Sequence, residues 1–119
     1  MSASQRNKGA AAEREVLKLL GQELGTVLER NISQTRAGGA DCLSIKGWAI
    51  EVKRQERLSR PAWWRQACRQ ASGIGEPLLL YRRSREPWTA WIHTRDGAYR
   101  EGTLIDAAQA IREKWSAWP

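Results

Sequence analysis

The sequence predicts an α/β protein in which a mixed central sheet is flanked by helices, in the order α-β-β-β-α-β-β-α. Three segments carry apolar residues at helical spacing, namely 8–24, 61–72 and the segment that starts near 104. Short strand-like runs lie between them, bounded by Gly, Pro and Asp turns. An early hairpin combined with later helical crossovers favours a mixed sheet. At 119 residues the chain is expected to form one domain, residues 1–119.

The first helix is expected over residues 8–24, with Asn7 as its N-cap and Gly25 as its stop signal. At 100° per residue Glu13 falls on the apolar stripe of this helix, whereas Arg14 falls outside it. The stripe consists of Glu13, Val16, Leu17, Leu20 and Leu24. The helix dipole can explain an acid in an early turn. It does not explain an acid that points at the core.

Strands are expected at 26–35, 41–45, 48–55, 77–83 and 88–94. Between them, Pro61 suits the first position of a helix that Gly73 ends. In the last helix, Thr103 and Asp106 resemble a capping box. The apolar stripe of that helix consists of Leu104, Ala107, Ala108, Ile111, Trp115 and Trp118.

The hairpin at 41–55 carries charges where a half-buried strand should be apolar. Glu51 and Lys53 point to the same side of their strand, because side chains alternate. A two-residue loop would place Asp41 on the opposite face. A three-residue loop, Ile45-Lys46-Gly47, would set Asp41 across from Glu51 and would need a left-handed glycine at its end, where Gly47 lies. The sequence permits the second register without proving it.

These charges have two interpretations. They form cross-strand ion pairs on a wet face, or they converge on a site. Two adjacent carboxylates raise each other's pKa unless a cation lies between them, and oxygen ligands of this kind suit Mg²⁺ or Mn²⁺. Glu13 could complete the acidic shell, and Lys53 could orient or help deprotonate a water or balance charge in the transition state. The chemistry that fits is metal-assisted phosphodiester hydrolysis.

The composition restricts the partners. Twenty Lys and Arg against thirteen Asp and Glu give a net charge of +7, which suits a polyanion such as nucleic acid, although it can also serve solubility. Cys42, Cys68 and His93 cannot supply a zinc site within one chain, and a disulfide framework is not expected. We expect His93 to be an ordinary sheet residue. Because no disulfide framework is expected, a reducing cytoplasm is the expected location. No run is long enough to cross a membrane.

The segments "RNKGAAAEREVLKLL", "TRAGGAD" and "AIEVK" resemble the PD-(D/E)xK nuclease superfamily, and within it the archaeal-type Holliday-junction resolvases. The similarity covers residues 6–55. It implies a restriction-endonuclease-like fold, a divalent-metal site and often a homodimer. By position, Glu13 matches the helix acid, Asp41 the aspartate of "PD", and Glu51 and Lys53 the "ExK" pair. The proline of "PD" is Ala40 here.

The resemblance and the basic residues together predict a DNA-binding surface. Arg14 and Arg36 match basic residues that lie near the DNA backbone in the resolvases. A cluster after the "ExK" strand is typical of phosphate contacts; it consists of Arg54, Arg57, Arg60, Arg65 and Arg69. Gln55, Gln66 and Gln70 are auxiliary candidates, and "WWRQACRQ" faintly resembles the glutamine-bearing helix of some phage exonucleases in this superfamily.

Seven tryptophans and no phenylalanine are unusual. We expect most of the indoles to fill the core or an interface, with Trp63 and Trp118 as the candidates for exposure. The core or interface set consists of Trp48, Trp64, Trp88, Trp91 and Trp115.

The leading hypothesis is a small, Mg²⁺- or Mn²⁺-dependent DNA endonuclease, dimeric and selective for branched DNA, of a size that would suit a phage enzyme. The alternatives are a general, nicking or exonucleolytic phage-type nuclease, and a non-catalytic DNA-binding module on the same fold. A third is an interaction protein that uses the stripe of the last helix.

Overall fold

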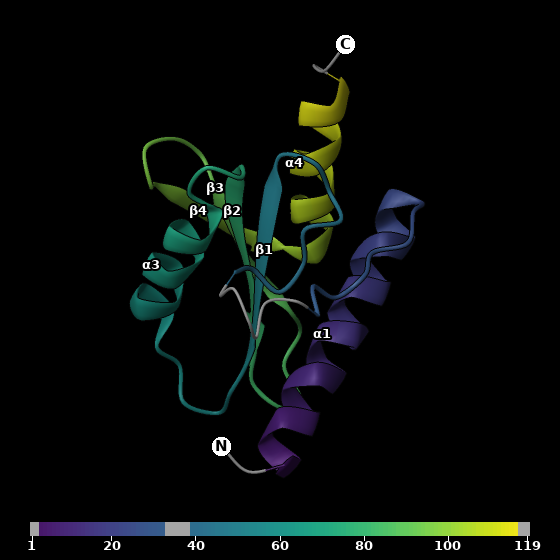
Figure 1. Ribbon diagram of the computed structural model, residues 1–119, viewed down its shortest axis with the longest axis vertical. Helices are drawn as coiled ribbons and strands as arrows, with labels where there is room; N and C mark the ends of the chain where they lie inside the picture. The colour runs from purple at the N-terminus through teal and green to yellow at the C-terminus, as the bar shows by residue number, and fades with distance from the viewer. Residues whose placement is uncertain (1–2, 33–38, 117–119) are drawn as a thin grey trace.

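The computed structural model describes residues 3–32 and 39–116, together with the side chains of residues 9–32 and 39–114. Helices enclose a four-stranded sheet in this part of the chain (Figure 1). The elements in chain order are α1 (Ala3–Leu24), β1 (Trp48–Arg54), α3 (Arg60–Ala71), β2 (Glu76–Arg82), β3 (Thr89–His93), β4 (Tyr99–Thr103) and α4 (Leu104–Ser116).

The sheet is mixed, with the strand order β1-β2-β3-β4. β1 and β2 run parallel and are joined by the crossover helix α3, whereas β2, β3 and β4 form antiparallel pairs. In the parallel pair, Lys53 lies beside Tyr81 and Arg54 beside Arg82. The predicted fold class, a mixed sheet with flanking helices, is therefore confirmed.

The sheet separates two layers of helix. α1 and α4 lie on one side of it and α3 on the other (Figure 1). The α1/α4 side holds an aliphatic core that includes Val16, Leu20, Ile50, Leu78 and Ile111, all without measurable exposure. Burying a side chain of this size contributes roughly 1.5–3 kcal/mol. None of the described helices is long and apolar enough to span a bilayer.

The α3 side holds an aromatic core. Trp63, Trp64, Tyr81 and Trp91 are each no more than 6% exposed and pack together there. The prediction that Trp63 is exposed is wrong, because α3 turns this indole onto Tyr81, with ring centroids 5.9 Å apart. Trp48, Trp64, Trp88 and Trp91 are buried as expected. The side chains of Trp115 and Trp118 lie outside the described residues.

The loop before β1 has the register of the three-residue turn. Cys42 and Ile50 form an antiparallel bridge with reciprocal hydrogen bonds of 3.1 and 3.0 Å. Gly47 has φ +86°, the left-handed conformation that the longer loop requires. Residues 41–45 make this one bridge and no extended strand, so the predicted strand there is reduced to a single pair.

The predicted strand at 26–35 is wrong over its described part, residues 26–32. The backbone N–H and C=O of Glu29 bond to the hydroxyl of Ser44 at 2.9 and 3.2 Å, so a side chain replaces the neighbouring strand. Val27 and Ile32 are each 80% exposed, which leaves these two apolar side chains unburied. Residues 33–35 lie outside the described residues.

Among the remaining elements, one predicted helix cap is wrong, one strand was missed and one capping box is confirmed. Asn7 is not the N-cap of α1, because the helix already begins at Ala3. β4 was missed because its residues are largely exposed and show no alternation of apolar side chains. The capping box of α4 is confirmed by reciprocal bonds between Thr103 and Asp106, at 2.8 and 3.1 Å. The observed order of elements therefore has one strand before α3 and three after it.

Gly75 permits a close crossing of two backbones. A Cβ at this position would lie 2.2 Å from the carbonyl carbon and oxygen of Gly47, which accepts the N–H of Glu76 at 2.8 Å. We expect Gly75→Ala to destabilise the protein by about 1–3 kcal/mol, because neither backbone can move freely. Urea unfolding measures this change.

The matched control is Gly9→Ala. A Cβ on Gly9, inside α1, would meet nothing within 4 Å, so the same substitution should stabilise the helix by about 0.5–1 kcal/mol. Equal unfolding midpoints for the two variants would contradict this account of the Gly47–Gly75 crossing.

Candidate active site

Three carboxylic side chains stand out by their burial. Glu13, Asp41 and Glu51 are 8%, 5% and 3% exposed, and they are the buried charged or polar residues of the described part of the chain. Burying an uncompensated carboxylate costs several kcal/mol. All three residues had been predicted from the sequence as site acids.

The Cys42–Ile50 bridge places Asp41 across from Glu51. The Asp41 carboxylate oxygen Oδ2 accepts the backbone N–H of Val52 at 2.7 Å. The backbone C=O of Asp41 accepts the N–H of Asn31, also at 2.7 Å. Asp41 is therefore fixed at both its backbone and its side chain.

Glu51 is the most buried of the three acids, and its Oε2 atom is buried without a hydrogen-bond partner. Burial, followed by the charge of Asp41 and a hydrogen bond to it, raises the pKa of Glu51 to about 9, while Lys53 acts in the opposite direction. An unsatisfied buried carboxyl oxygen is unusual in a folded protein. It indicates a position where a cation or another ligand belongs.

Glu13 reaches the same place from α1. Its burial, followed by a hydrogen bond to Asp41 and the charge of that residue, raises the pKa of Glu13 to about 7. Arg30 opposes this rise through an ion pair, with its Nε atom 3.0 Å from Oε2 of Glu13. The structure thus brings Glu13, Asp41 and Glu51 into one electrostatic cluster.

Lys53 is half-buried, two residues after Glu51 on the same side of β1. Its effect on the pKa of Glu51 shows that its charge acts at the cluster. The four predicted catalytic residues are therefore brought together.

Whether the acidic cluster suits a divalent metal depends on the donor atoms that it offers. In the described residues, no three Asp, Glu, His or Cys side chains are arranged to hold an ion by themselves. Mg²⁺ commonly binds one or two carboxylates and completes its shell with waters and phosphate oxygens. The neighbouring carboxyls of Asp41 and Glu51, with the unsatisfied Oε2 atom, fit that requirement. Glu13 is held by Arg30 and would join as an outer acid.

Arg30 is a site residue that the sequence interpretation missed. It lies in the segment assigned to a strand, and nothing in that pattern distinguishes it from a solvent-exposed arginine. The neighbouring Asn31 ties this segment to the site, because its side chain donates to the C=O of Ala40 at 3.0 Å. Both neighbours of Arg30 are therefore fixed, Glu29 by its bonds to Ser44 and Asn31 by its bonds to residues 40 and 41. These bonds hold Arg30 beside Glu13.

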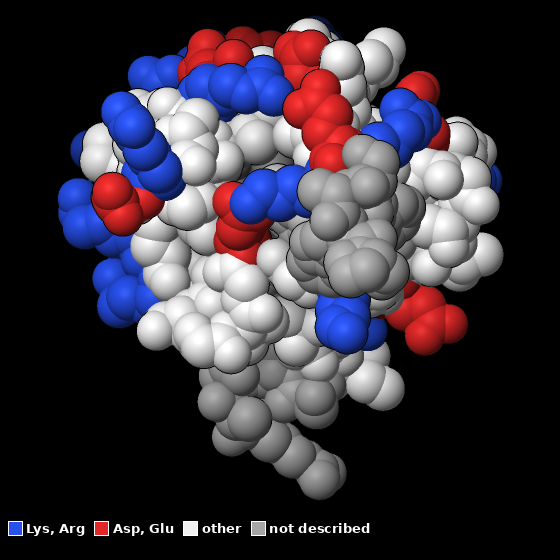
Figure 2. Space-filling view, turned by 90° about the horizontal axis from the view of Figure 1, so that it is seen from above, with Lys and Arg blue, Asp and Glu red and all other residues white. Residues whose placement is uncertain are grey.

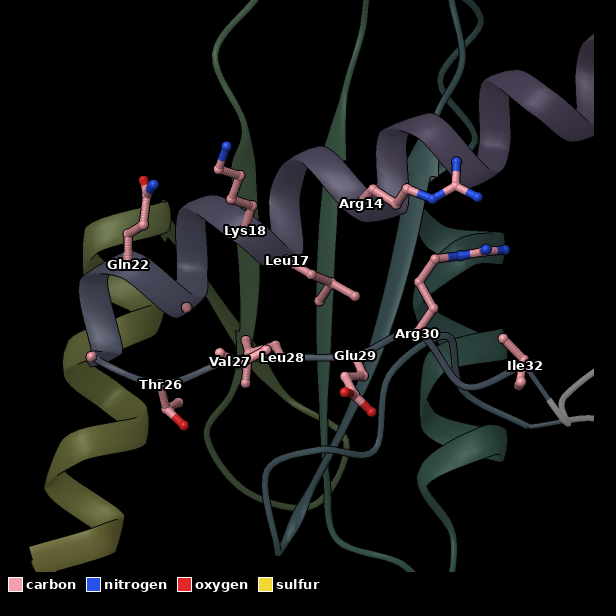
Figure 3. Close-up of a pocket in the computed structure, with 12 residues that line it drawn as sticks. Arg14, Leu17, Lys18, Gln22, Thr26, Val27, Leu28, Glu29, Arg30 and Ile32 are labelled. Atoms are coloured by element: carbon pink, nitrogen blue, oxygen red, sulfur yellow. The ribbon is translucent and has the colours of Figure 1, made fainter.

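A pocket of about 820 Å³ lies between α1 and residues 25–32 and is lined by Arg14, Lys18 and Arg30 among others. Arg14 and Arg30 extend the same way from the two walls of this pocket (Figure 3). Their guanidinium groups give one end of the pocket a positive character next to Glu13. Guanidinium groups bind phosphate oxygens through two parallel hydrogen bonds.

The other predicted DNA contacts differ in their exposure. Arg57, Arg60, Arg65 and Arg69 are exposed, as a phosphate contact requires, whereas Arg36 lies outside the described residues. Arg54 is half-buried and donates to the hydroxyl of Ser84 at 2.9 Å. Its contact is therefore within the protein. The face seen in Figure 2 carries both basic and acidic side chains, with several basic ones along its left edge.

The auxiliary glutamines differ in position. Gln70 lies near the loop that precedes Asp41, since a Cβ at Gly39 would be 4.0 Å from its Oε1 atom. Gln66 is half-buried on the same helix, and Gln55 is exposed after β1.

His93 ends β3 and faces Glu76, with 3.0 Å between Nδ1 and Oε1, in keeping with the structural role expected for it. Cys42 and Cys68 are free thiols.

Comparison with known proteins bears on the family and the fold of the chain. The model of a protein family described as "Phage putative PDDEXK endonuclease" matches residues 4–114. Among solved structures, the chain is similar to the Holliday junction resolvase Hjc of Archaeoglobus fulgidus, with a TM-score of 0.59 and 17% identity. The match covers 83% of this chain and 97% of the other. No curated protein matches the chain.

The raised pKa of Glu51 predicts how stability depends on pH in metal-free protein. Between its ordinary value of 4.5 and about 9, the folded protein holds a proton that the unfolded chain has released. The free energy of unfolding should therefore fall as pH rises through this window, by about 1.4 kcal/mol for each unit of pKa difference. Glu13 should add to the fall between 4.5 and about 7.

Thermal unfolding in EDTA, from pH 5 to pH 9, checks this prediction. Glu51→Gln should flatten the profile and raise the melting temperature at the alkaline end, because it removes the buried charge. Glu113→Gln, on the exposed face of α4, is the matched control and should keep the wild-type slope. The same slope in Glu51→Gln would contradict the assignment.

Proposed function

The chain belongs to the phage PDDEXK endonuclease family, and from this membership we propose that it is a divalent-metal-dependent DNA endonuclease that acts on branched DNA. The observation that carries the proposal is the burial of Glu13, Asp41 and Glu51 in one cluster. A folded domain gains no stability from three desolvated acids, so a chemical role is the best reason for their presence.

Each residue has a distinct role in this mechanism. Asp41 and Glu51 would hold Mg²⁺ or Mn²⁺, which supplies Lewis-acid activation of a phosphodiester and of the attacking water. Lys53, on the same side of β1 as Glu51, orients that water or balances the charge that develops on the phosphate. Glu13, which lies on α1, adds its negative charge to the cluster. The Asp41 carboxylate is held for its role by the N–H of Val52, at 2.7 Å.

Branched DNA is the proposed substrate because two lines of support agree. The segments at 6–55 resemble junction resolvases, and the similar solved structure is named as a Holliday junction resolvase. Symmetric cleavage of a junction needs two active sites related by a twofold axis, so we propose a homodimer. A general or nicking nuclease would use the same acids on plain duplex. A binding-only module would have no use for them.

Asp41→Asn should reduce cleavage at least a hundredfold, because it removes a charge that the metal needs, while DNA binding stays within about twofold of wild type. The assay offers a four-way junction, a flap, single-stranded DNA and linear duplex with Mg²⁺ or Mn²⁺. Asp106→Asn, at the capping box of α4, is the control for loss of an acid and should leave cleavage unchanged.

The pattern of products decides the substrate. Cuts confined to the junction and lost in Asp41→Asn support the full proposal. Cleavage of every substrate supports the metal site but contradicts branch selectivity. Salt-dependent binding without any cleavage contradicts the nuclease and favours the binding module.

Arg30 should matter for catalysis through its ion pair with Glu13, at 3.0 Å. We expect Arg30→Ala to lower kcat about tenfold or more, because Glu13 then loses its counter-charge. Arg30→Lys should recover part of the rate, since it keeps the charge without the planar fork. The metal concentration that gives half-maximal rate should change in Arg30→Ala as well. Equal kcat and metal dependence in all three proteins would show that Arg30 acts only in folding.

A further inference from the structure

A tight turn follows β2 at the end of the sheet where β1 also finishes. Residues 83–86 form this turn, closed by a hydrogen bond of 3.2 Å from the N–H of Glu86 to the C=O of Arg83. In Figure 1 it lies at the same end as the loop after β1 and the first half of α1. The proposed mechanism makes no use of this turn.

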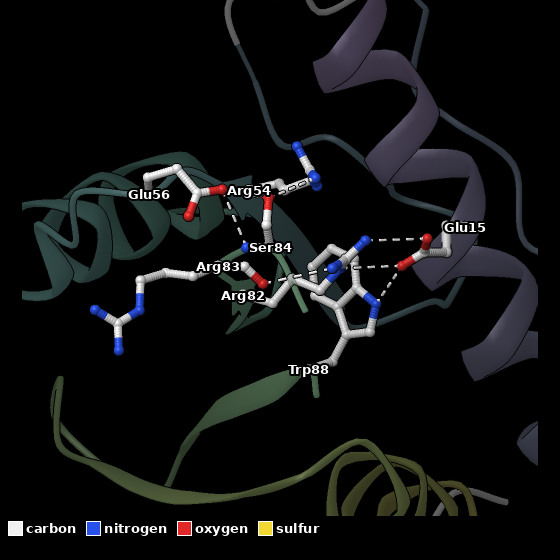
Figure 4. A network of polar contacts seen from close by, with 7 residues as sticks. All are labelled: Glu15, Arg54, Glu56, Arg82, Arg83, Ser84 and Trp88. Carbon is white, nitrogen blue, oxygen red and sulfur yellow. Dashed lines mark hydrogen bonds and ion pairs between the residues drawn. The ribbon is translucent and has the colours of Figure 1, made fainter. Parts of the chain in front are cut away.

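Polar contacts hold the turn in place (Figure 4). Ser84 receives a hydrogen bond from Arg54 at 2.9 Å, and its hydroxyl and N–H both donate to Glu56. Arg83 pairs with Glu86 through two nitrogens. The turn is thus bound to β1 and to the loop that follows β1, so it keeps a fixed position relative to Lys53.

A second set of contacts fixes the base of the turn. Arg82 pairs with Glu15 at 3.2 Å and lies over the ring of Trp88, 5.3 Å from its centroid. The indole N–H of Trp88 donates to the same Glu15 at 2.7 Å. Glu15 and Glu86 are therefore engaged by Arg82 and Arg83, and Glu56 is engaged by Ser84.

Arg85 is the exception in this network. It is exposed, and within the described part of the chain no ion pair or hydrogen bond of its side chain is present. Its φ of +65° lies in the left-handed region, which a side-chain-bearing residue other than Asn or Asp rarely adopts. The comparable non-glycine residue in the turn after β3 is Asp96, which tolerates this conformation. A strained arginine kept at an exposed tip points to a use for its charge.

The turn is close to the proposed active site along the sheet. Arg82 pairs in register with Arg54, which directly follows Lys53. Arg85 is three residues further on, which corresponds to at most roughly 10 Å of extended chain. That reach suits a phosphate near the cleaved bond, on the same DNA strand or its complement.

We propose that the turn at residues 83–86 is a second DNA-backbone contact, in which Arg85 binds a phosphate next to the one that is cleaved. The proposal rests on the proposed function in taking DNA as the ligand. Such a contact positions the strand without reading its sequence. The braced turn presents one guanidinium at a set distance from Lys53, and a rigid donor loses little entropy on binding.

Arg85→Gly separates this role from a structural one. Glycine adopts positive φ freely, so the melting temperature should stay at or above that of wild type while DNA affinity falls. We expect the dissociation constant to rise roughly three- to tenfold, and the slope of log K against log salt to decrease by about 1. Arg85→Lys should keep most of the affinity.

The control is Arg95→Gly, which removes one exposed charge from the turn between β3 and β4, at the other end of the sheet. Affinity is measured in an Asp41→Asn background without divalent metal, on a labelled duplex and a labelled four-way junction, from about 50 to 200 mM salt. Cleavage is followed separately, in an Arg85→Gly variant that keeps the native Asp41.

The outcomes distinguish this proposal from the proposed function. Weaker binding with a smaller salt slope in Arg85→Gly, but not in Arg95→Gly, supports the contact even if the wild type cleaves nothing. Equal affinity and slope in the two variants would overturn it, even in an active nuclease. A melting temperature that falls together with affinity would also overturn it, because the residue would then act through the fold. Absence of DNA binding by the wild type would overturn both proposals.

Discussion

Two hydrogen bonds between Cys42 and Ile50 determine the geometry on which the rest of the site depends. They set Asp41 across from Glu51, and they require the left-handed turn at Gly47, φ +86°. A slip of one residue would send Asp41 to the opposite side of the hairpin. The close crossing of Gly47 and Gly75 connects this turn to the start of β2, so the register is supported from both sides.

The same geometry places mutually repelling acids in a dry environment. Burial and the proximity of Asp41 raise the pKa of Glu51 to about 9 and that of Glu13 to about 7. The protein offsets this cost with hydrogen bonds to Asp41 and with the charge of Arg30. Cores without such acids are more stable, and sites that give up stability in this way are typically functional. The ion pair with Arg30 also shows that Glu13 is held in position before any ligand arrives.

The topology explains how distant segments supply one site. β1 is an edge strand of the sheet, so α1 can pass beside it and direct Glu13 toward residues of the opposite face. Because β1 and β2 are parallel, their carboxyl ends lie together, and the loop after one strand braces the turn after the other. Lys53, the proposed metal ligands and the turn at residues 83–86 thereby share one rigid support.

The sequence by itself determined the fold class and the four catalytic candidates. Alternation on β1 and helical spacing in α1 are local properties, and they were enough to place Glu51 beside Lys53 and Glu13 on the apolar stripe, whereas Asp41 joined them through a permitted hairpin register and through the family resemblance. Tertiary structure decided the rest. It chose between the two hairpin loops, replaced the expected strand near Glu29 with bonds to Ser44, buried Trp63 against Tyr81, and brought Arg30 to Glu13. The role proposed for Arg85 rests on its backbone angle and on the contacts that Ser84, its neighbour in the turn, makes with Glu56 and Arg54. The contacts of Glu29 with Ser44, of Trp63 with Tyr81 and of Arg30 with Glu13 join residues more than ten positions apart in the chain, and no local pattern encodes such contacts.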